Sequence, residues 1–366
     1  MNKAQLGQFF TPETIVDKMI SLIQNKGKIL EPSCGNGAFF NKIDNCIGIE
    51  IDRTVAPKNS IVMDFFDWKN SVDTIIGNPP YVRYQDILPT TQQKLPQGYD
   101  NRTNLYIYFI DRSIDLLNDN GELIFITPRD FIKTTSALPL NKRLYEEGGF
   151  TYWEEFGDIQ IFPNASPNVV IFRWVKNNPH KINVEYHNGY LTFSNSNKIN
   201  KIYINELFTI LVGGASGANS IFIEDSGNID LVVSTTKATQ QTRKAHYVDA
   251  PTPYLQEYKE QLLARKIKKF TEDNWWEWGR KIRHIDGPKI YVNGRTRDLQ
   301  PFFTNDSGWF DGSVLALIPK KENPYSIEEL IKLLNNNNWE EQGFKVGGRL
   351  MFGQRSLTNA YLKISN

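Results

Sequence analysis

Apolar runs alternate with polar stretches along the first 174 residues of the chain, in a pattern that predicts regular secondary structure. Residues 104–118 repeat apolar side chains at the spacing of one helix face, and residues 11–23 do the same near the start. Short apolar runs typical of buried strands lie at 28–30, 46–52, 60–68, 73–77, 121–128, 151–162 and 168–175. Strands that alternate with helices predict an α/β fold with a doubly wound, mostly parallel sheet.

The first helix pattern, "TPETIVDKMISLI", carries start signals of its own. Thr11 can act as the N-cap, and Pro12 then occupies the first helical position, where its missing N–H costs nothing. We therefore expect a helix that begins at Pro12 and precedes the first strand.

The character of the sequence changes after about residue 175, where polar, Asn-rich segments replace the buried runs. Residues 253–270 are predicted to form one basic amphipathic helix, and residues 326–338 a second helix. We place a domain boundary between residues 175 and 176. The second domain, 176–366, is expected to be irregular α+β.

Three successive apolar runs end in a carboxylate, namely Glu31, Glu50 and Asp64. In an α/β sheet, ligands bind beyond the carboxyl ends of the strands. Glu50 can accept two hydrogen bonds from a ribose diol, while Asp64 can bind an adenine amino group with Phe65 against the ring. Each acid alone also fits an ordinary strand end, but together the three indicate a nucleoside-containing ligand.

These segments resemble the gamma class of DNA amino-methyltransferases, which methylates adenine at N6. The motifs that carry the resemblance are "GQFFTP" (7–12), "EPSCGNGAF" (31–39), "GIEID" (48–52), "DFF" (64–66), "NPPY" (78–81), 104–117, 121–132 and "IFPNASPNVVIF" (161–172). Less specifically, "FKVGGRLMFGQRSLTN" (344–359) resembles the tails of recognition domains in this class.

The resemblance implies a Rossmann-like methyltransferase sheet with one antiparallel strand, followed by a target-recognition domain. It implies S-adenosylmethionine as the cofactor, bound by residues 1–175, and double-stranded DNA as the partner of residues 176–366. The cofactor contacts it implies are Phe10, Thr11, Pro12, Glu31, Cys34, Gly35, Gly37, Glu50, Ile51, Asp64 and Phe65. A cognate restriction endonuclease would share the same target site.

The segment "NPPY" offers chemistry that suits methylation of an aromatic amine, whose lone pair is delocalised into the ring. The side-chain oxygen of Asn78 and the carbonyl of Pro79 can accept hydrogen bonds from the two N–H groups of the amine and so localise that lone pair. Pro79 and Pro80 stiffen the loop. Tyr81 can stack on a base that has left the duplex, and by resemblance Phe162 forms the other wall.

Other acceptors remain open from the sequence. Release-factor glutamine-N5 methyltransferases also use "NPPY", but they carry a helical domain before the first motif and little after the catalytic domain. Cytosine N4 and RNA amines pose the same chemical problem as adenine N6. A binding module without enzymatic activity would take up no S-adenosylmethionine. Cytosine C5 methylation is disfavoured because Cys34 follows Ser33 and Cys46 follows Asn45, so no Pro-Cys nucleophile exists.

The formal net charge of +1 conceals an uneven distribution. Residues 1–174 hold 17 Lys and Arg against 21 Asp and Glu, whereas residues 175–366 hold 25 against 20. Basic residues interleaved with tryptophans suit contact with phosphates, although a solvated surface over a tryptophan core fits equally well. The candidates for DNA contact are Arg83, Lys266, Lys269, Arg280, Lys281, Arg283, Arg295 and Arg297.

Composition sets further expectations. The four His and two Cys residues make no zinc pattern, so no metal is expected. The sequence contains no apolar run of membrane-spanning length and begins without an apolar signal region. We therefore expect a protein of the bacterial or archaeal cytoplasm, with no membrane contact. We also expect it to be a monomer.

Overall fold

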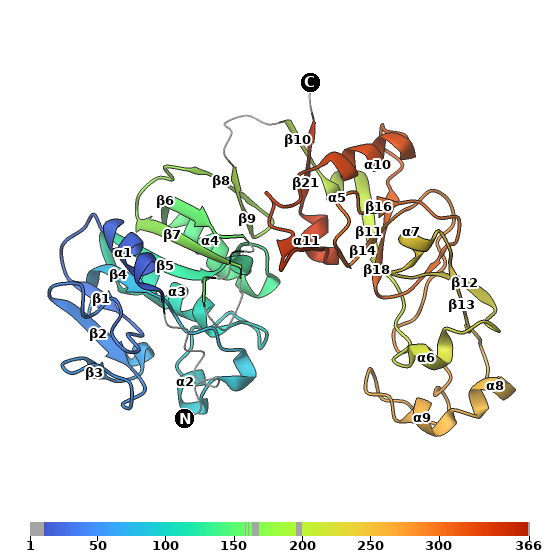
Figure 1. Ribbon diagram of the computed structural model, residues 1–366, viewed down its shortest axis with the longest axis horizontal. Helices are drawn as coiled ribbons and strands as arrows, with labels where there is room; N and C mark the ends of the chain where they lie inside the picture. The colour runs from blue at the N-terminus through green and yellow to red at the C-terminus, as the bar shows by residue number, and fades with distance from the viewer. Residues whose placement is uncertain (1–10, 158, 160, 163–167, 195–199, 365–366) are drawn as a thin grey trace. The chain divides into compact units, whose positions relative to one another are not determined.

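The computed structural model describes residues 11–157, 159, 161–162, 168–194 and 200–364 (Figure 1). The chain divides into two compact units. Unit 1 consists of residues 1–198 together with 341–347, and unit 2 consists of residues 199–340 together with 348–366. The late segment 341–347 therefore belongs to the unit that the first half of the chain builds.

Unit 1 is built on a seven-stranded sheet with the order β3-β2-β1-β4-β5-β7-β6 (Figure 1). Its strands are β1 (Ile29–Glu31), β2 (Cys46–Glu50), β3 (Ile61–Val62), β4 (Val72–Gly77), β5 (Leu117–Pro128), β6 (Gly148–Glu155) and β7 (Val169–Lys176). The pairs from β3 to β5 are parallel, whereas β7 runs antiparallel to both β5 and β6. The predicted α/β sheet with one antiparallel strand is confirmed.

Side chains alternate between the two faces of this sheet and build two separate cores. Ile75 and Leu123 pack on one face, and Ile76 and Ile124 on the other. The first core includes helices α3 (Leu105–Leu116) and α4 (Leu138–Glu146), and the second includes α1 (Glu13–Ser21). Strands buried on both faces explain the continuous apolar runs in the sequence. The connections add η1 (Phe65–Asp67), η2 (Tyr84–Asp86), α2 (Pro89–Gln92), η3 (Arg129–Ile132) and η4 (Thr135–Ala137).

The first helix begins one residue later than the sequence predicts. Pro12 is the N-cap residue of α1, in an extended conformation with ψ of 146°, and its carbonyl accepts from the N–H groups of Ile15 and Val16, each at 3.0 Å. The predicted Thr11 cap is wrong, because Pro12 itself occupies the N-cap position and no side chain caps this end of the helix. The Thr11 hydroxyl contacts Asn78 instead.

Unit 1 extends beyond the predicted boundary at 175. The hairpin of β8 (Asn183–His187) and β9 (Tyr190–Ser194) packs onto the first core, where Leu191 is buried. The Phe193 ring stacks on Trp153 with centroids 3.7 Å apart. The polar, Asn-rich residues around this hairpin therefore conceal two strands that belong to unit 1.

Unit 2 combines small sheets with short helices. An antiparallel sheet has the order β11-β18-β14-β16, β12 pairs with β13 and β17, β10 pairs with β21, and β15 pairs with β20. These strands are β10 (Asn200–Tyr203), β11 (Phe208–Val212), β12 (Ile229–Val232), β13 (Arg243–Ala245), β14 (Ile290–Asn293), β15 (Arg295–Thr296), β16 (Phe302–Phe303), β17 (Trp309–Phe310), β18 (Val314–Pro319), β20 (Arg349–Met351) and β21 (Tyr361–Ile364). The helices are α5 (Ile204–Leu207), α6 (Asn219–Phe222), α7 (Thr236–Thr239), α8 (Pro253–Gln256), α9 (Lys259–Leu263), α10 (Ile327–Asn336) and α11 (Gln354–Thr358).

The predicted basic helix over 253–270 is wrong, because this region forms only α8 and α9 and the helix ends at Leu263. Arg265 provides the physical reason. Its buried guanidinium donates to the carbonyls of Leu262 at 2.8 Å, Ser216 at 2.5 Å and Trp275 at 2.5 Å, and it lies 3.8 Å from the centroid of Phe270. These tertiary contacts turn the chain inward where the apolar periodicity alone predicts a continuing helix.

Among the residues that the structure describes, no helix has the length and apolar character needed to cross a membrane.

Candidate active site

The predicted ligand residues converge at one edge of the sheet of unit 1. Strands β2, β1 and β4 are adjacent and parallel, so their carboxyl ends lie together. Glu31 ends β1, Glu50 ends β2, and Asn78 directly follows β4. Residues spread over almost fifty positions of the sequence thus meet at the place where this type of sheet binds its ligands.

The turn after β1 is held by the end of β2. The Cys34 N–H donates to the Ile49 carbonyl at 2.8 Å, and the Gly35 N–H donates to one Glu50 oxygen at 2.7 Å. The other Glu50 oxygen accepts from the Asp52 N–H at 2.9 Å. Gly35 has φ of 53°, and a Cβ there would meet no atom within 4 Å. The turn therefore leaves open space beside its backbone, next to an oriented carboxylate.

Two acids and a thiol in this turn are shielded from solvent. The Glu31 carboxylate accepts from the Phe40 N–H at 2.7 Å, and burial raises its pKa well above the usual range. Burial, together with the charges of Glu31 and Glu50, raises the pKa of the Cys34 thiol to about 12. Burial also raises the pKa of Cys46 to about 12. Because a thiolate is the nucleophilic form, neither cysteine is activated for attack.

Asp64 and Phe65 follow the third strand as predicted, but both have protein partners. One Asp64 oxygen accepts from the Phe66 N–H at 3.1 Å and the other from the Thr91 hydroxyl at 2.7 Å. Phe65 is buried and stacks on Phe109 with centroids 4.8 Å apart. One ring face is thus used in the core, and the contact of Phe65 with a cofactor adenine stays a prediction.

The segment Asn78–Tyr81 has a defined orientation at the strand end. The side-chain Nδ2 of Asn78 donates to the Thr11 hydroxyl at 3.2 Å, and the Ser33 hydroxyl donates to the Asn78 carbonyl at 3.3 Å. Because the amide nitrogen faces Thr11, the amide oxygen lies on the other branch of the side chain. Pro79 and Pro80 follow in a stretch without helix or strand structure.

The two predicted walls of a base pocket lie together. The Tyr81 hydroxyl donates to the Ile126 carbonyl of β5 at 3.0 Å, and the Tyr81 ring meets Phe162 edge-on with centroids 6.3 Å apart and planes at 73°. Phe162 is only 1% exposed, and Tyr106 also meets Tyr81 edge-on. The two ring planes are therefore far from parallel, and the role of the rings as walls for a base stays a prediction.

The remaining predicted cofactor residues lie at or near this edge. Pro12 is half-buried at the start of α1, Ile51 follows Glu50, and Gly37 adopts φ of 88° in the turn after β1. Phe10 lies outside the described residues.

Sequence reasoning missed two features of the site. The first is the hydrogen bond between Thr11 and Asn78, because Thr11 was expected only as a helix cap and a cofactor contact. The second is Asn104, the residue before α3, whose Oδ1 is buried and accepts no hydrogen bond within the described part of the chain. The neighbouring Leu105 N–H donates to the Val82 carbonyl at 2.8 Å, which brings Asn104 close to the segment Asn78–Tyr81. An Asn directly before a helical pattern is the only sequence signal for it.

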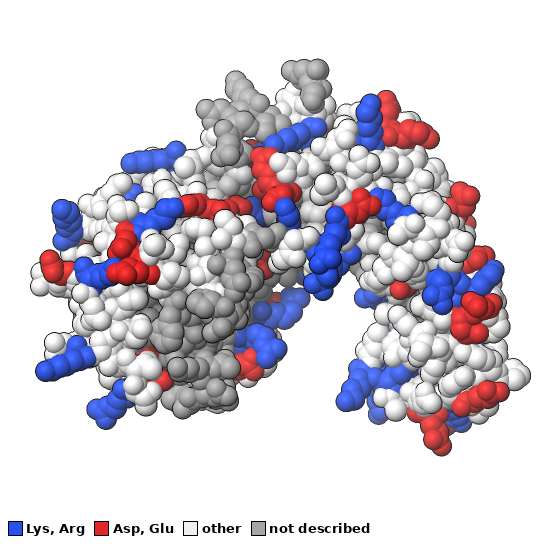
Figure 2. All heavy atoms as spheres, in the orientation of Figure 1, with Lys and Arg blue, Asp and Glu red and all other residues white. Residues whose placement is uncertain are grey.

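The predicted DNA-contact residues are exposed, and Figure 2 shows Lys and Arg interspersed with Asp and Glu on the face it draws. In unit 1, Arg83 pairs with Asp86 at 2.7 Å. In unit 2, the exposed candidates are Lys266, Lys269, Arg280, Lys281, Arg283, Arg295 and Arg297. Trp275 and Trp278 are 2% and 3% exposed and belong to a hydrophobic core, so they do not offer faces for stacking.

Three of the arginines in unit 2 form what we call the arginine patch: Arg295, Arg297 and Arg349. The charges of Arg295 and Arg297 lower the pKa of Arg349. The pairing of β15 with β20 brings them together across more than fifty residues of sequence. Sequence reasoning named the first two residues and missed Arg349.

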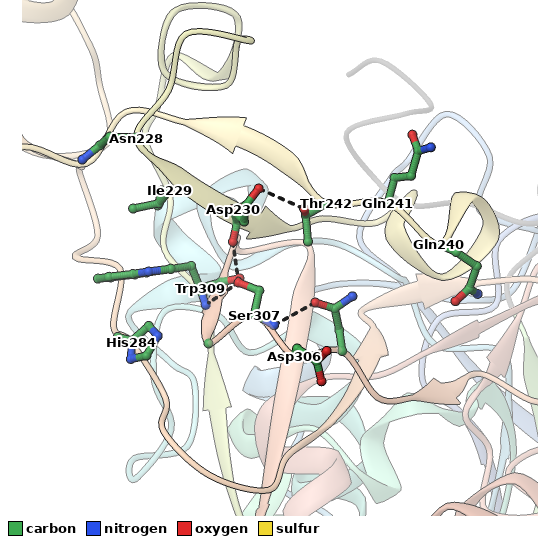
Figure 3. A pocket seen from close by; sticks show the side chains of 12 residues that line it. Asn228, Ile229, Asp230, Gln240, Gln241, Thr242, His284, Asp306, Ser307 and Trp309 are labelled. Carbon is green, nitrogen blue, oxygen red and sulfur yellow. Dashed lines mark hydrogen bonds between the residues drawn. The ribbon is translucent and has the colours of Figure 1, made fainter.

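Unit 2 also contains an open pocket of about 840 Å³ (Figure 3). Asp230 lies at its centre, where the Thr242 hydroxyl donates to its carboxylate at 3.3 Å and the Ser307 hydroxyl donates to its carbonyl. The exposed Gln241 side chain points away from this hydrogen-bonded group (Figure 3). Gln240 and Gln241 present uncharged amides at the pocket, and the Lys244 ammonium donates to the Asp230 carboxylate at 3.1 Å.

Among the described residues, no group of three or more His, Cys, Asp or Glu side chains is arranged to hold a metal ion.

Comparison with known families gives a match over residues 17–162 to the family described as Eco57I restriction-modification methylase. The chain is 39% identical over 191 residues to the Type II methyltransferase M.HincII of Haemophilus influenzae, a match that covers 48% of this chain and 38% of the relative. It is 21% identical to the Type II methyltransferase M.BanIII of Aneurinibacillus aneurinilyticus, with 93% of this chain and 85% of that protein covered.

Among solved structures, the chain is similar to the Type IIL restriction-modification enzyme MmeI in complex with DNA. The TM-score is 0.63 at 12% sequence identity, over 95% of this chain and 64% of that chain. At this identity the likeness is one of fold alone. It extends through both units of the chain, and the chain spans less than two fifths of the length of the HincII relative.

Proposed function

Because residues 17–162 carry a restriction-modification methylase domain, we propose that this chain is a site-specific DNA methyltransferase acting on adenine N6 in duplex DNA. The arrangement after β4 carries the proposal. There, Thr11 orients the Asn78 amide beside the edge-on rings of Tyr81 and Phe162. An amide acceptor next to an aromatic pocket suits a flat ring with an exocyclic amine, such as adenine.

The domain family implies S-adenosylmethionine as the methyl donor, and this group supplies an electrophilic methyl when bound. The open space beside Gly35 and the oriented Glu50 carboxylate fit its nucleoside part. Thr11 and Pro12 would lie toward its methionine end. Asp64 would accept from the adenine amino group through a lone pair that Phe66 and Thr91 leave on its oxygens.

The chain's own groups would prepare the amine for methylation. The Asn78 side-chain oxygen and the Pro79 carbonyl accept hydrogen bonds from the two N–H groups of the amine. These bonds pull the nitrogen lone pair out of conjugation with the ring. The 3.2 Å hydrogen bond to Thr11 holds the Asn78 side chain at the strand end. Two neutral acceptors need no deprotonated base before attack.

Residues of unit 2 would bind the duplex. The arginine patch and the exposed Lys and Arg side chains of residues 266–283 supply charge for phosphate oxygens. The exposed amides of Gln240 and Gln241 are of the type that reads adenine edges in the major groove. The methylated site would protect host DNA from a cognate endonuclease in the cytoplasm, and we propose that the chain acts as a monomer.

The test is methyl transfer by the purified protein to genomic DNA, with the modified base mapped by modification-sensitive sequencing. We expect N6-methyladenine at one short site, and Asn78→Ala lowering the rate by about a hundredfold or more. Asn70→Ala, at an exposed position outside the site, is the matched control and keeps wild-type activity. S-adenosylmethionine binding, followed by calorimetry, stays intact in both variants.

The alternatives predict different products. Methylation of cytosine N4 would keep the site chemistry and change the base. A methylated glutamine in a release factor, with unmodified DNA, would overturn the proposal. Wild-type activity in Asn78→Ala would contradict the proposed mechanism, because that mechanism depends on Asn78.

A further inference from the structure

The segment Glu341–Gly347, which we call the strap, belongs to unit 1 although the residues on both sides of it belong to unit 2. It includes β19 (Lys345–Val346) and the first residues of the tail motif "FKVGGRLMFGQRSLTN". The proposed function gives this part of the motif no role. The strap is therefore a point at which the second half of the chain enters the structure of the first.

The strap is held by specific contacts with the end of β5 and with the start of β7. The Arg129 Nη2 donates to the Glu341 carbonyl at 3.2 Å, and the Asn168 Nδ2 donates to the Lys345 carbonyl at 3.2 Å. The Lys133 ammonium lies 4.3 Å from the centroid of the Phe344 ring, which is 3% exposed. The strap thus contacts the rest of unit 1 at Glu341, Phe344 and Lys345.

Gly343 marks the tightest point of this contact. It adopts φ of 69°, and a Cβ there would lie 1.1 Å from Arg129 Nη1 and 2.7 Å from Lys133 Nζ. No side chain fits unless Arg129 or the strap moves. Gly347, at the end of the same segment, has φ of 57° and no atom within 4 Å of the corresponding position.

Arg129 connects the strap to the candidate active site. It directly follows β5, its N–H donates to the Asn168 carbonyl at 2.8 Å, and its guanidinium pairs with Glu155 at 2.6 Å. Three residues earlier on the same strand, the Ile126 carbonyl accepts from the Tyr81 hydroxyl at 3.0 Å. A continuous set of hydrogen bonds and one short length of strand therefore join the strap to Tyr81.

We propose that the strap positions the target-base pocket: by holding Arg129 and Asn168, it fixes the end of β5 that orients Tyr81. This inference rests on the proposed function and adds to it. Arg129 and Asn168 are positioning residues, because they act through the strand instead of contacting the base. Methyl transfer then depends on a segment supplied by the half of the chain that carries the proposed recognition unit.

The first test compares Gly343→Ala with Gly347→Ala. Both substitutions place alanine at a left-handed φ, but only the first creates a clash with Arg129. We expect Gly343→Ala to lower the single-turnover methylation rate about tenfold or more. S-adenosylmethionine affinity is expected to stay within about twofold of wild type, a difference well below 1 kcal/mol. Gly347→Ala is expected to keep the wild-type rate. Equal rates in the two variants would overturn the inference.

A double-mutant cycle separates positioning from general loss of structure. Arg129→Ala removes the side chain that the new Cβ would strike, so the double variant Gly343→Ala, Arg129→Ala is expected to be no slower than Arg129→Ala alone. Additive losses would mean that Gly343 acts independently of Arg129, which contradicts the proposed connection. Far-ultraviolet circular dichroism confirms that each variant is folded.

Hydrogen–deuterium exchange provides a readout that does not require DNA. In Gly343→Ala, amides at the end of β5, including the Arg129 N–H, are expected to exchange faster than in Gly347→Ala. Unchanged exchange would contradict the inference even if the methylation rate fell. A wild-type protein that methylates no DNA would contradict the proposed function alone, and the exchange comparison would still decide whether the strap holds this strand.

Discussion

At the scale of single residues, the site depends on polar groups whose orientation comes from neighbours in space. Asn78 has its amide nitrogen on Thr11, and Tyr81 has its hydroxyl on the Ile126 carbonyl. A neutral hydrogen bond of this kind contributes about 1 kcal/mol, enough to favour one position of the side chain. Burial keeps the nearby thiol of Cys34 protonated and inert.

Thr11→Val removes the acceptor of the Asn78 amide with little change in volume. We expect the single-turnover methylation rate to fall about fivefold to tenfold, which corresponds to the loss of about 1 kcal/mol of orientation energy. Thr11→Ser keeps the hydroxyl and is expected to stay near wild type. A wild-type rate in Thr11→Val would show that the hydroxyl does not position Asn78.

Cys34 and Cys46 are expected to resist alkylation in the folded protein. Because burial raises both pKa values to about 12, the thiolate fraction near neutral pH is very small and rises only as the pH approaches that value. Mass spectrometry after iodoacetamide treatment should show unmodified cysteines in the native protein and two modified ones after denaturation. Rapid alkylation of the native protein at neutral pH would contradict the described burial.

At the scale of elements, buried polar clusters end or connect segments that periodicity alone would continue. Arg265 is the clearest case, since it is 8% exposed and its guanidinium binds three backbone carbonyls next to Phe270. Burial lowers the pKa of Arg265 to about 10, which still leaves it charged near neutral pH. A charged side chain is thus part of the internal framework of unit 2.

Arg265→Ala leaves three carbonyls without their donor, and we expect the free energy of unfolding to fall by about 3 kcal/mol or more. Urea unfolding monitored by tryptophan fluorescence suits the measurement, because Trp275 and Trp278 lie in the same core. Lys266→Ala, at the exposed neighbouring position, is the control and is expected to change stability by less than about 0.5 kcal/mol. A similar small effect in both variants would show that Arg265 is not structural.

At the scale of the whole molecule, the chain is two compact units connected more than once. Residues 1–198 and the strap form the unit with the candidate active site, and the rest forms the unit with the arginine patch. Each unit has hydrophobic cores of its own. We propose that unit 1 carries out the methyl transfer and that unit 2 recognises DNA.

Removing one guanidinium of the arginine patch, as in Arg349→Ala, is expected to weaken DNA binding uniformly across sequences. The slope of log K against log salt concentration should become shallower by about 1 for each lost phosphate contact. Lys26→Ala, an exposed substitution in unit 1, is the control. Fluorescence anisotropy over a series of salt concentrations measures DNA binding by both variants. An unchanged slope in Arg349→Ala would exclude the patch from the DNA interface.

The sequence by itself determined the sheet of unit 1 and the chemistry at its edge. Strands that are buried on both faces must be apolar, so they can be found as apolar runs in the sequence. The ligand-binding side chains at the carboxyl ends of these strands come at or directly after the end of each run. Glu31, Glu50 and Asn78 could therefore be located without a structure. That Phe162 would lie beside Tyr81 was expected only from the family resemblance, and the structure places the two rings in edge-on contact.

Only the tertiary structure decided which residues far apart in sequence support these groups. The Thr11 hydroxyl on Asn78, Arg265 at the end of α9, Arg349 beside Arg295 and the strap on Arg129 all depend on contacts across tens to hundreds of residues. Local periodicity records which face of a segment is buried, but it carries no information about what lies against that face. The partners of a buried polar group are set by the folded chain as a whole.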